Sequence, residues 1–335
     1  MTKVAINGFG RIGRCFVRAA KAAKADFEIV AINDLGSLDN LAYLLKYDTV
    51  YRKAPFAVAA ENGALMIDGK PVAFSQEKEL AKLPWGKLGV DIVVESTGVF
   101  TDPAKAKGHL DAGAKRVVIS APAKGEGAET VMIGANEDKF GVGVITSNAS
   151  CTTNAASPLI GILDEAIGIE KAVLSTTHGY TASQALVDGS KTKDWKEGRA
   201  AAQNIVPTSS GAAISTAVAY PKLKGKFDGF SVRVPVVAGS LVDVTFIAER
   251  PTSVEEVNNA LKVAAQTDRW KRVFTVTEEE LVSSDIIGEP YGAIADLGLT
   301  RVIDGNLVKV VAWYDNEMGY THTLVQHVLE AGKNL

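Results

Sequence analysis

The sequence is poor in several features that define special classes of protein. It contains only two cysteines in 335 residues, which argues against a disulfide framework and favours a reducing, cytoplasmic compartment. No apolar run approaches the length of a membrane span, and no basic segment followed by an apolar stretch marks a signal peptide. The net charge of −3 gives no electrostatic reason to expect nucleic acid or a membrane surface as a partner.

The remaining composition is that of an ordinary globular protein. Hydrophobic residues make up 47% of the chain and charged residues 22%, which are typical values for soluble domains. A chain of 335 residues is long enough for two domains with a substantial core. The sequence shows no internal repeat and no low-complexity segment.

The first half of the chain alternates apolar strand patterns with helical patterns. Two tight-turn signals, Asn62-Gly63 and Asp68-Gly69, indicate an inserted β-hairpin region. The expected strands are 4–7, 28–33, 91–95, 116–120 and 142–146, and the expected helices are 11–23, 40–47 and 102–112. The strands are β-branched and nearly continuous in apolar character, as in strands buried on both faces. This pattern predicts an α/β domain with a doubly wound parallel sheet.

The second half has a different texture. Alternating strand patterns dominate at residues 171–177, 230–234, 242–249 and 307–314. Helical patterns are fewer, at 155–167, 211–220, 254–266 and 318–331, and a long polar stretch covers 182–204. We therefore expect an α+β domain with a largely antiparallel sheet, and the polar stretch is of a length that is usually functional or interfacial.

A glycine-rich motif sits between the first expected strand and the first expected helix. Gly8, Gly10 and Gly13 fit the pattern G-x-G-x-x-G, in which the glycines permit the turn, the approach of a pyrophosphate and close helix packing. Asp34 follows the second strand, where an acidic side chain binds a ribose 2′-hydroxyl and repels a 2′-phosphate. The motif predicts an NAD site; a glycine-rich turn that binds nothing is the alternative.

A cysteine lies where a strand pattern gives way to a helix pattern. Cys151 stands within Ser147-Asn148-Ala149-Ser150-Cys151-Thr152-Thr153-Asn154, and His178 follows in Thr177-His178-Gly179. The positive end of a helix favours a thiolate, and backbone N–H groups there can hold an oxyanion or phosphate. A histidine could pair with the thiolate and exchange protons. The alternative is a buried structural cysteine and an unrelated core histidine.

With these motifs in place, the chain resembles the phosphorylating glyceraldehyde-3-phosphate dehydrogenases. The resemblance runs from the N-terminal segment Val4 to Arg14 to the C-terminal run Trp313-Tyr314-Asp315-Asn316-Glu317-Met318-Gly319-Tyr320, and the octapeptide around Cys151 is its most specific part. It implies a Rossmann-type NAD-binding domain over residues 1–150 and a catalytic domain over 151–315. The final helix, within 316–335, would pack back on the first domain.

The resemblance also implies a reaction of glycolysis and gluconeogenesis. D-glyceraldehyde 3-phosphate would be oxidised to 1,3-bisphosphoglycerate with NAD and inorganic phosphate, through a thiohemiacetal and a thioester on Cys151, with His178 as the base. The resemblance also implies which residues bind the substrate and which bind the cofactor. The substrate and phosphate residues would be Ser150, Thr152, Thr181, Ser210, Gly211 and Arg233. The cofactor residues would be Gly8, Gly10, Arg11, Ile12, Gly13, Asp34, Lys78, Ser120 and Asn316, and no metal is expected.

The sequence departs from the usual family pattern at two of these site residues, and three alternative functions stay open. Lys78 stands where the family usually has arginine, and Ser210 stands where it usually has threonine. Erythrose-4-phosphate dehydrogenase, which hydrolyses its thioester, is one alternative, and an NADP-using gluconeogenic paralogue, disfavoured by Asp34, is another. A dinucleotide-binding protein without turnover is the third. The resemblance further implies a homotetramer, with residues 182–204 at a subunit boundary.

Overall fold

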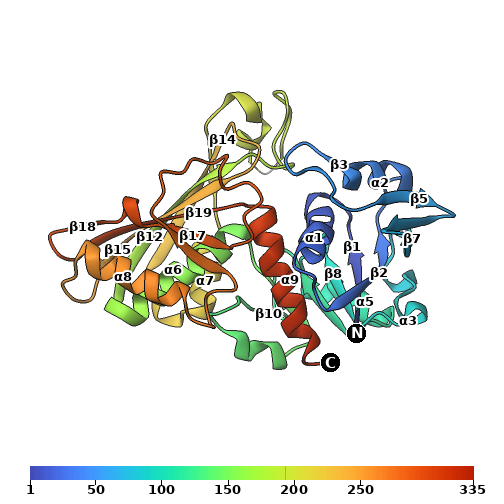
Figure 1. Cartoon of the computed structure of the whole chain (residues 1–335), viewed down its shortest axis with the longest axis horizontal. Coiled ribbons are helices and arrows are strands. Elements are labelled where there is room, and N and C mark those ends of the chain that lie inside the picture. The colour runs from blue at the N-terminus through green and yellow to red at the C-terminus, as the bar shows by residue number, and fades with distance from the viewer. Residues whose placement is uncertain (193) are drawn as a thin grey trace. The chain divides into compact units, whose positions relative to one another are not determined.

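The computed structural model describes residues 1–192 and 194–335, and these residues divide into two compact units (Figure 1). The first comprises residues 1–131, 136–149 and 324–335, and the second comprises residues 132–135 and 150–323. Lys193, within the expected polar stretch 182–204, lies outside the described residues. The domain bounds expected from the sequence, 1–150 and 151–315 with a returning segment 316–335, stay a prediction.

A mostly parallel sheet forms the centre of the first unit, with the strand order β10-β11-β9-β8-β1-β2-β7-β6-β5. Its strands are β1 (Thr2–Asn7), β2 (Phe27–Asn33), β5 (Val58–Glu61), β6 (Ala64–Ile67), β7 (Lys70–Ser75), β8 (Ile92–Glu95), β9 (Arg116–Ile119), β10 (Glu129–Thr130) and β11 (Ile145–Ser147). All pairs from β10 to β7 are parallel, which confirms the predicted doubly wound sheet. The order reverses at β1, between β2 and β8, and such a switch point is where α/β sheets bind ligands.

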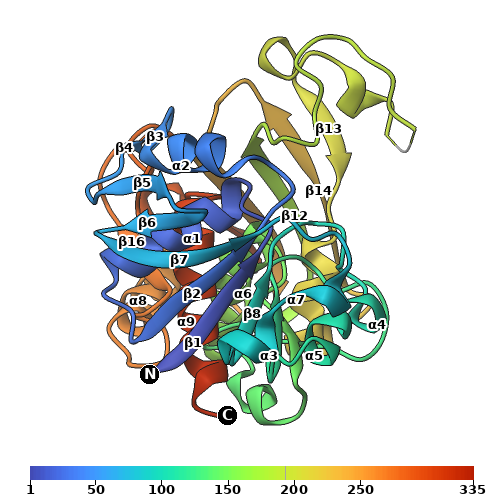
Figure 2. The ribbon, with the colours of Figure 1, turned by 90° about the vertical axis from the view of Figure 1, so that its right-hand side faces the viewer.

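Helices cover both faces of this sheet. Figures 1 and 2 place α1 (Arg11–Ala22) on one face, and α3 (Trp85–Leu88) and α5 (Gly108–Asp111) on the other. The buried side chains of Ala5 and Val93 belong to a cluster that includes Trp85 of α3. The other elements of the first unit are α2 (Leu38–Lys46), α4 (Pro103–Ala106), the strands β3 (Tyr47–Asp48) and β4 (Arg52–Lys53), the 3₁₀ turns Leu80–Lys82 and Glu137–Gly141, and the end of α9 (Met318–Gly332).

Both predicted tight turns are present. Asn62 and Gly63 have φ values of 51° and 74°, and Asp68 and Gly69 have values of 49° and 75°. Two successive positive φ angles define the type I′ turn, whose twist matches that of antiparallel strands. The turns join β5 to β6 and β6 to β7, and β7 then pairs in parallel with β2.

Two expected elements of this unit differ in the structure. The helix expected over residues 102–112 is two short helices, α4 and α5, interrupted at Lys107. Gly108, the first residue of α5, lies so close to Leu80 that an added Cβ would be 2.9 Å from the Leu80 Cβ. The strand expected from residue 142 begins only at Ile145, since the 3₁₀ turn Glu137–Gly141 precedes it.

The second unit is built on a largely antiparallel sheet, as predicted. Its main order is β13-β14-β12-β15-β19-β17-β16, with β18 paired to β19. The strands are β12 (Ile169–Gly179), β13 (Val206–Ser209), β14 (Phe227–Val234), β15 (Ser240–Ala248), β16 (Phe274–Thr277), β17 (Ala293–Asp296), β18 (Arg301–Ile303) and β19 (Leu307–Tyr314). The pairs β12–β14 and β16–β17 are parallel. The sequence patterns did not predict the short strands β13, β16, β17 and β18.

One face of the second sheet is covered by helix α6 (Cys151–Ile167). β15 alternates buried with partly exposed residues, as expected for a strand with one covered face. α6 also packs against α7 (Ala212–Ala219) and α8 (Val254–Ala265). The short 3₁₀ turns of this unit are Lys196–Gly198, Ala201–Gln203, Pro221–Leu223 and Leu297–Leu299.

No helix in residues 1–192 and 194–335 combines the length and the apolar character that crossing a bilayer requires.

Candidate active site and cofactor site

Cys151 is the first residue of α6, which begins four residues earlier than the expected helix at 155. The side-chain oxygen of Ser150 caps the helix by accepting a hydrogen bond from the Thr153 backbone N–H at 3.1 Å. Ala149, two residues before Cys151, has a φ of 55°, in the left-handed region that residues other than glycine rarely adopt. The chain therefore turns sharply before Cys151 and presents it at the positive end of a 17-residue helix.

His178, near the end of β12, lies against this cysteine. Its Nε2 is 3.3 Å from the Sγ of Cys151, and its Nδ1 is 2.6 Å from the Gly179 carbonyl oxygen. A carbonyl only accepts hydrogen bonds, so Nδ1 carries the proton and Nε2 presents its lone pair to the sulfur. His178 is buried, whereas Cys151 is partly exposed. The two residues are therefore arranged for transfer of the thiol proton to Nε2.

Burial controls the charge of this pair. It raises the pKa of Cys151, although the charge of Arg233 and hydrogen bonds from Thr152 and the backbone oppose the shift. Burial also lowers the pKa of His178 to about 3, and the positive charge of Arg233 adds to this effect. Burial therefore opposes the thiolate that the helix end was expected to favour, and both pKa shifts favour a thiol beside a neutral imidazole.

Arg233 is the cation of this site. It lies on β14 directly beside His178, because these two residues are register partners in the parallel pair β12–β14. Its Nε and Nη1 atoms are buried and have no hydrogen-bond partner among the described residues. A buried guanidinium without an acceptor is unfavourable unless an anion completes it. The site is therefore suited to a phosphate or carboxylate ligand.

Tyr314, at the end of β19, is a member of the site that the sequence patterns did not single out. Its hydroxyl lies 2.9 Å from the Thr152 hydroxyl and 2.8 Å from the Thr176 hydroxyl. Its ring packs edge-on against the ring of His178, with centroids 5.9 Å apart. The sequence offered one signal for Tyr314, which lies two residues before Asn316 in the C-terminal run that carries the resemblance.

The other expected substrate residues occupy local turns and caps. Thr181 contacts Ser183 through its hydroxyl, and the Ser210 hydroxyl accepts from the Ala212 backbone N–H at 3.2 Å. Gly211 is the N-cap of α7, and a Cβ there would meet nothing within 4 Å. The hydroxyls of Ser150 and Thr152 already have protein partners. The roles expected for these residues stay predictions.

In the first unit, the glycine-rich motif leads from β1 into α1. Gly8 has a φ of 92°, and a Cβ on it would lie 2.6 Å from the Thr97 backbone nitrogen. A Cβ on Gly13 would lie 2.3 Å from the Gly8 carbonyl oxygen, whereas a Cβ on Gly10 would meet nothing within 4 Å. Gly8 and Gly13 are therefore required by packing, and Gly10 leaves open space beside a helix N-terminus that no described side chain caps.

A cavity of about 350 Å³ lies at the switch point and is lined by Gly8, Gly10, Asp34 and Lys78, among others. Both Asp34 oxygens face backbone donors: Oδ2 accepts from Phe9 at 2.6 Å, and Oδ1 accepts from Gly36 at 2.8 Å. Asp34 is thus fixed between the end of β2 and the glycine motif. This open backbone, with a carboxylate beside it, fits the pyrophosphate and ribose of a dinucleotide.

Five expected cofactor residues do not line this cavity. Arg11 forms an ion pair with Asp48 and lies over the Tyr51 ring, and Ile12 and Gly13 follow in the first turn of α1. Ser120 comes directly after β9, where its N–H donates to the Glu95 carbonyl. Asn316 belongs to the second unit, and its Oδ1 accepts from Gly239 and Ser240. Their cofactor contacts stay predictions.

Comparisons with known proteins match both parts of the chain to one family. Residues 2–103 match the family model of the glyceraldehyde 3-phosphate dehydrogenase NAD-binding domain, and residues 150–316 match that of the C-terminal domain. Glyceraldehyde-3-phosphate dehydrogenase of Mycobacterium avium is 50% identical over 340 aligned residues, covering 99% of both chains. The Mycobacterium tuberculosis enzyme is 49% identical, and glyceraldehyde-3-phosphate dehydrogenase 1 of Streptomyces avermitilis is 48% identical, each with 99% coverage of both chains. The chain therefore belongs to the glyceraldehyde-3-phosphate dehydrogenase family.

Proposed function

We propose that this chain oxidises D-glyceraldehyde 3-phosphate to 1,3-bisphosphoglycerate, with NAD as hydride acceptor and inorganic phosphate as the second substrate. The observation that carries the proposal is the 3.3 Å contact between Cys151 Sγ and the unprotonated Nε2 of His178, beside the unpartnered guanidinium nitrogens of Arg233. The family and its relatives set the reaction class. NAD supplies the two-electron oxidation when bound in the first unit.

The first half of the reaction uses the neutral thiol and imidazole. As Sγ attacks the aldehyde carbon, Nε2 takes the thiol proton and then returns it to the carbonyl oxygen, which becomes the hydroxyl of a thiohemiacetal. Backbone N–H groups at the start of α6 stabilise the developing oxyanion. When the hydride leaves this carbon, Nε2 accepts the hydroxyl proton and a thioester remains on Cys151. General base catalysis of this kind contributes about 10²- to 10⁴-fold to a rate.

The second half of the reaction needs an anion site. Inorganic phosphate attacks the thioester carbon, the C–S bond breaks, and the sulfur leaves as a thiolate that regains its proton. The buried nitrogens of Arg233 can bind the attacking phosphate or the phosphate of the substrate, since a planar guanidinium matches two phosphate oxygens. Thr181, Ser210 and Gly211, with Ser150 and Thr152, are proposed to complete the two phosphate contacts.

The first experiment is NADH formation from D-glyceraldehyde 3-phosphate and NAD, with and without inorganic phosphate. Phosphate-dependent turnover supports the proposal. Turnover that is indifferent to phosphate would instead indicate a hydrolysing relative, and erythrose 4-phosphate is then the substrate to test. Absence of turnover with either substrate, in a chain that still binds NAD, would favour a non-catalytic dinucleotide-binding protein.

We also propose that the chain works as a cytoplasmic homotetramer. Both cysteines are free thiols, as a reducing compartment would keep them. Large apolar side chains in the polar stretch 182–204 are exposed in the single chain: Leu186 and Trp195 are each 82% exposed. Exposed apolar groups of this size are typical of surfaces that meet another subunit. Light scattering coupled to size-exclusion chromatography tests the assembly, and a monomer would contradict it.

A further inference from the structure

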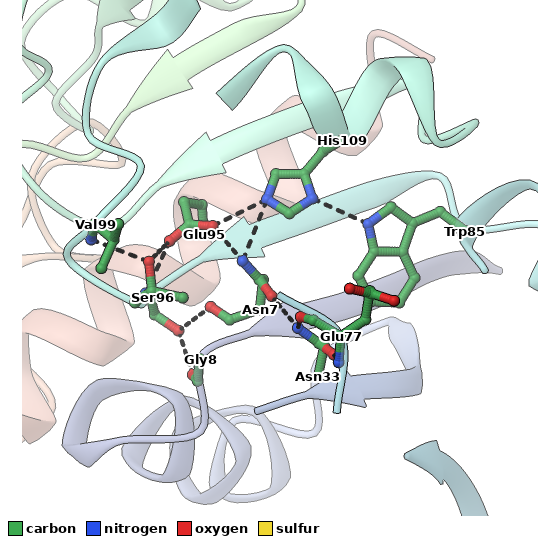
Figure 3. A network of polar contacts seen from close by, with 10 residues as sticks. Asn7, Gly8, Asn33, Glu77, Trp85, Glu95, Ser96, Val99 and His109 are labelled. Carbon is green, nitrogen blue, oxygen red and sulfur yellow. Dashed lines mark hydrogen bonds and ion pairs between the residues drawn. The ribbon is translucent and has the colours of Figure 1, made fainter. Parts of the chain in front are cut away.

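A buried polar network lies behind the dinucleotide cavity, and its centre is Glu95 at the end of β8 (Figure 3). Glu95 is 2% exposed and His109, on α5, is fully buried. Neither residue lines the cavity, and neither belongs to the glycine motif or to the cysteine site. A carboxylate is among the groups least often buried in proteins, so its presence here requires a physical reason.

Both carboxylate oxygens of Glu95 accept hydrogen bonds from neighbouring residues. Its Oε1 accepts from the backbone N–H of Thr97 at 2.8 Å and from the Thr97 hydroxyl. Its Oε2 accepts from the Asn7 amide at 2.6 Å and from His109 Nε2 at 2.9 Å. Two donors on each oxygen satisfy a buried carboxylate. A neutral amide in its place would turn one acceptor into a donor that faces other donors.

The proton positions on His109 follow from its other neighbour. The indole N–H of Trp85 is 3.0 Å from His109 Nδ1, and an indole nitrogen can only donate. Nδ1 therefore has no proton, and Nε2 carries the one that it donates to Glu95. The result is a directed series of hydrogen bonds, from Trp85 on α3 through His109 to Glu95 on the sheet (Figure 3).

The groups that Glu95 holds form the wall of the cavity. Asn7 accepts from Asn33 at 2.8 Å, which connects the ends of β1 and β2. The Ser96 hydroxyl donates to the Gly8 carbonyl at 2.7 Å, and the Thr97 backbone touches the position where a Gly8 side chain would start. The residues Asn7, Gly8, Asn33, Ser96 and Thr97 all line the cavity. One buried carboxylate thus fixes the wall residues of three neighbouring strand ends.

We propose that Glu95 and His109 are positioning residues for NAD: they hold the ends of β1, β2 and β8 at the spacing that the cofactor requires without touching it. The proposal deepens the function proposed above, since it assigns the residues behind the NAD site. NAD binding would then depend on the hydrogen bonds of this network and not only on the stability of the fold.

The test is the dissociation constant of NAD, measured by calorimetry on the nucleotide-free full-length chain, together with the melting temperature. Glu95→Gln leaves donors of the cavity wall unpaired, so it should weaken NAD binding about tenfold, which corresponds to about 1.4 kcal/mol. kcat at saturating NAD and the KM for the aldehyde should change less than the NAD constant. His109→Leu should behave like Glu95→Gln, because it removes the donor to Oε2.

Two further variants separate positioning from folding. His109→Gln can donate to Glu95 and accept from Trp85, so it should keep the NAD constant within about threefold of the wild type. Arg116→Met is the matched control. Arg116 is the first residue of β9 and donates to the Phe140, Gly143 and Asn334 carbonyls, and none of these residues lines the cavity. It should lower the melting temperature and leave NAD binding unchanged.

Trp85→Phe keeps the proposal testable if the Glu95 and His109 variants do not fold. It removes the donor to Nδ1 together with part of a buried ring, and it should weaken NAD binding measurably. An unchanged NAD constant in the folded variants, with only a lower melting temperature, would overturn the proposal. Failure of the proposed reaction would look different, since wild-type chain would bind NAD without turning over the aldehyde.

Discussion

His178 and Arg233 are register partners on the parallel strands β12 and β14, so a neutral imidazole lies beside a guanidinium with two buried nitrogens, next to Cys151. This neighbour shifts the pKa values of both reacting groups in the same direction. Arg233 lowers the pKa of the Cys151 thiol, which helps the nucleophile, and lowers the pKa of His178, which keeps its Nε2 available to accept a proton. The cation therefore supports both partners of the proton transfer as well as binding an anion.

Replacing Cys151 by serine tests the covalent mechanism. Because a serine hydroxyl is a much weaker nucleophile than a thiolate, Cys151→Ser should lower turnover at least about a thousandfold. NAD binding, which uses the first unit, should be retained in calorimetry. Unchanged turnover would rule out the thiohemiacetal and the thioester.

The state of the resting thiol can be measured directly by alkylation. Burial raises the pKa of Cys151, so the rate of its reaction with iodoacetamide should climb with pH into the alkaline range in the absence of substrate. Because the pKa of His178 is about 3, the profile should show no inflection near pH 6.5. A plateau of full reactivity between pH 5 and 7 would instead indicate a preformed thiolate–imidazolium pair.

Arg233 should matter for the phosphate substrates and for the thiol together. Arg233→Met removes the anion contact and the charge, so the KM for inorganic phosphate or for the aldehyde substrate should rise about tenfold or more. The alkylation profile of Cys151 should move to higher pH, since the charge of Arg233 lowers its pKa in the wild type. Arg233→Lys is the control that keeps the charge and loses the planar fork. An unchanged alkylation profile in the methionine variant would contradict this electrostatic role.

Asp34 should govern the choice between NAD and NADP. Its carboxylate lines the cofactor cavity and would repel a 2′-phosphate. Asp34→Ala should therefore lower kcat/KM with NAD and raise the ratio of NADP to NAD activity, with exposed Lys78 in the same cavity as the nearby cation. A ratio equal to that of the wild type would show that another residue sets the preference.

Buried neutral histidines predict acid sensitivity. Burial lowers the pKa of His327 from 6.5 to about 3, so the unfolded chain binds a proton that the folded chain does not. The free energy of unfolding should then fall as the pH drops from about 6.5 towards 3, by about 1.4 kcal/mol per pH unit for each such histidine. His327→Gln should narrow the difference in melting temperature between pH 7 and pH 5. An equal difference in both proteins would contradict the assignment.

The sequence was most informative where a function or turn depends on neighbouring residues. The glycines at 8, 10 and 13, the turns Asn62-Gly63 and Asp68-Gly69, and the position of Cys151 near a helix start are local patterns, and the structure has each feature. The family resemblance and both sheet types are confirmed. The residue roles that no observation tests stay predictions.

Residues brought together by the fold were harder to predict. No pattern in the sequence shows that Arg233 pairs in register with His178, or that Tyr314 reaches Thr152 and Thr176. Glu95 ends an apolar strand, where the sequence indicates only the polar end of that strand, although its carboxylate is buried and hydrogen-bonded inside the fold. The direction of the Cys151 pKa shift could not be predicted from the sequence for the same reason, because burial depends on distant segments of the chain.

The last helix, α9, has a consequence for how the chain is made. Residues 324–335 belong to the first unit, where His327 meets Thr146 at 2.7 Å and the Asn334 carbonyl accepts from Arg116 at 2.7 Å. These partners lie 181 and 218 residues further along the chain than Thr146 and Arg116, so they are synthesised long after the parallel sheet. The parallel sheet therefore stays incomplete until these residues have been synthesised, and a fragment ending at residue 149 would leave buried Arg116 and Thr146 without these contacts.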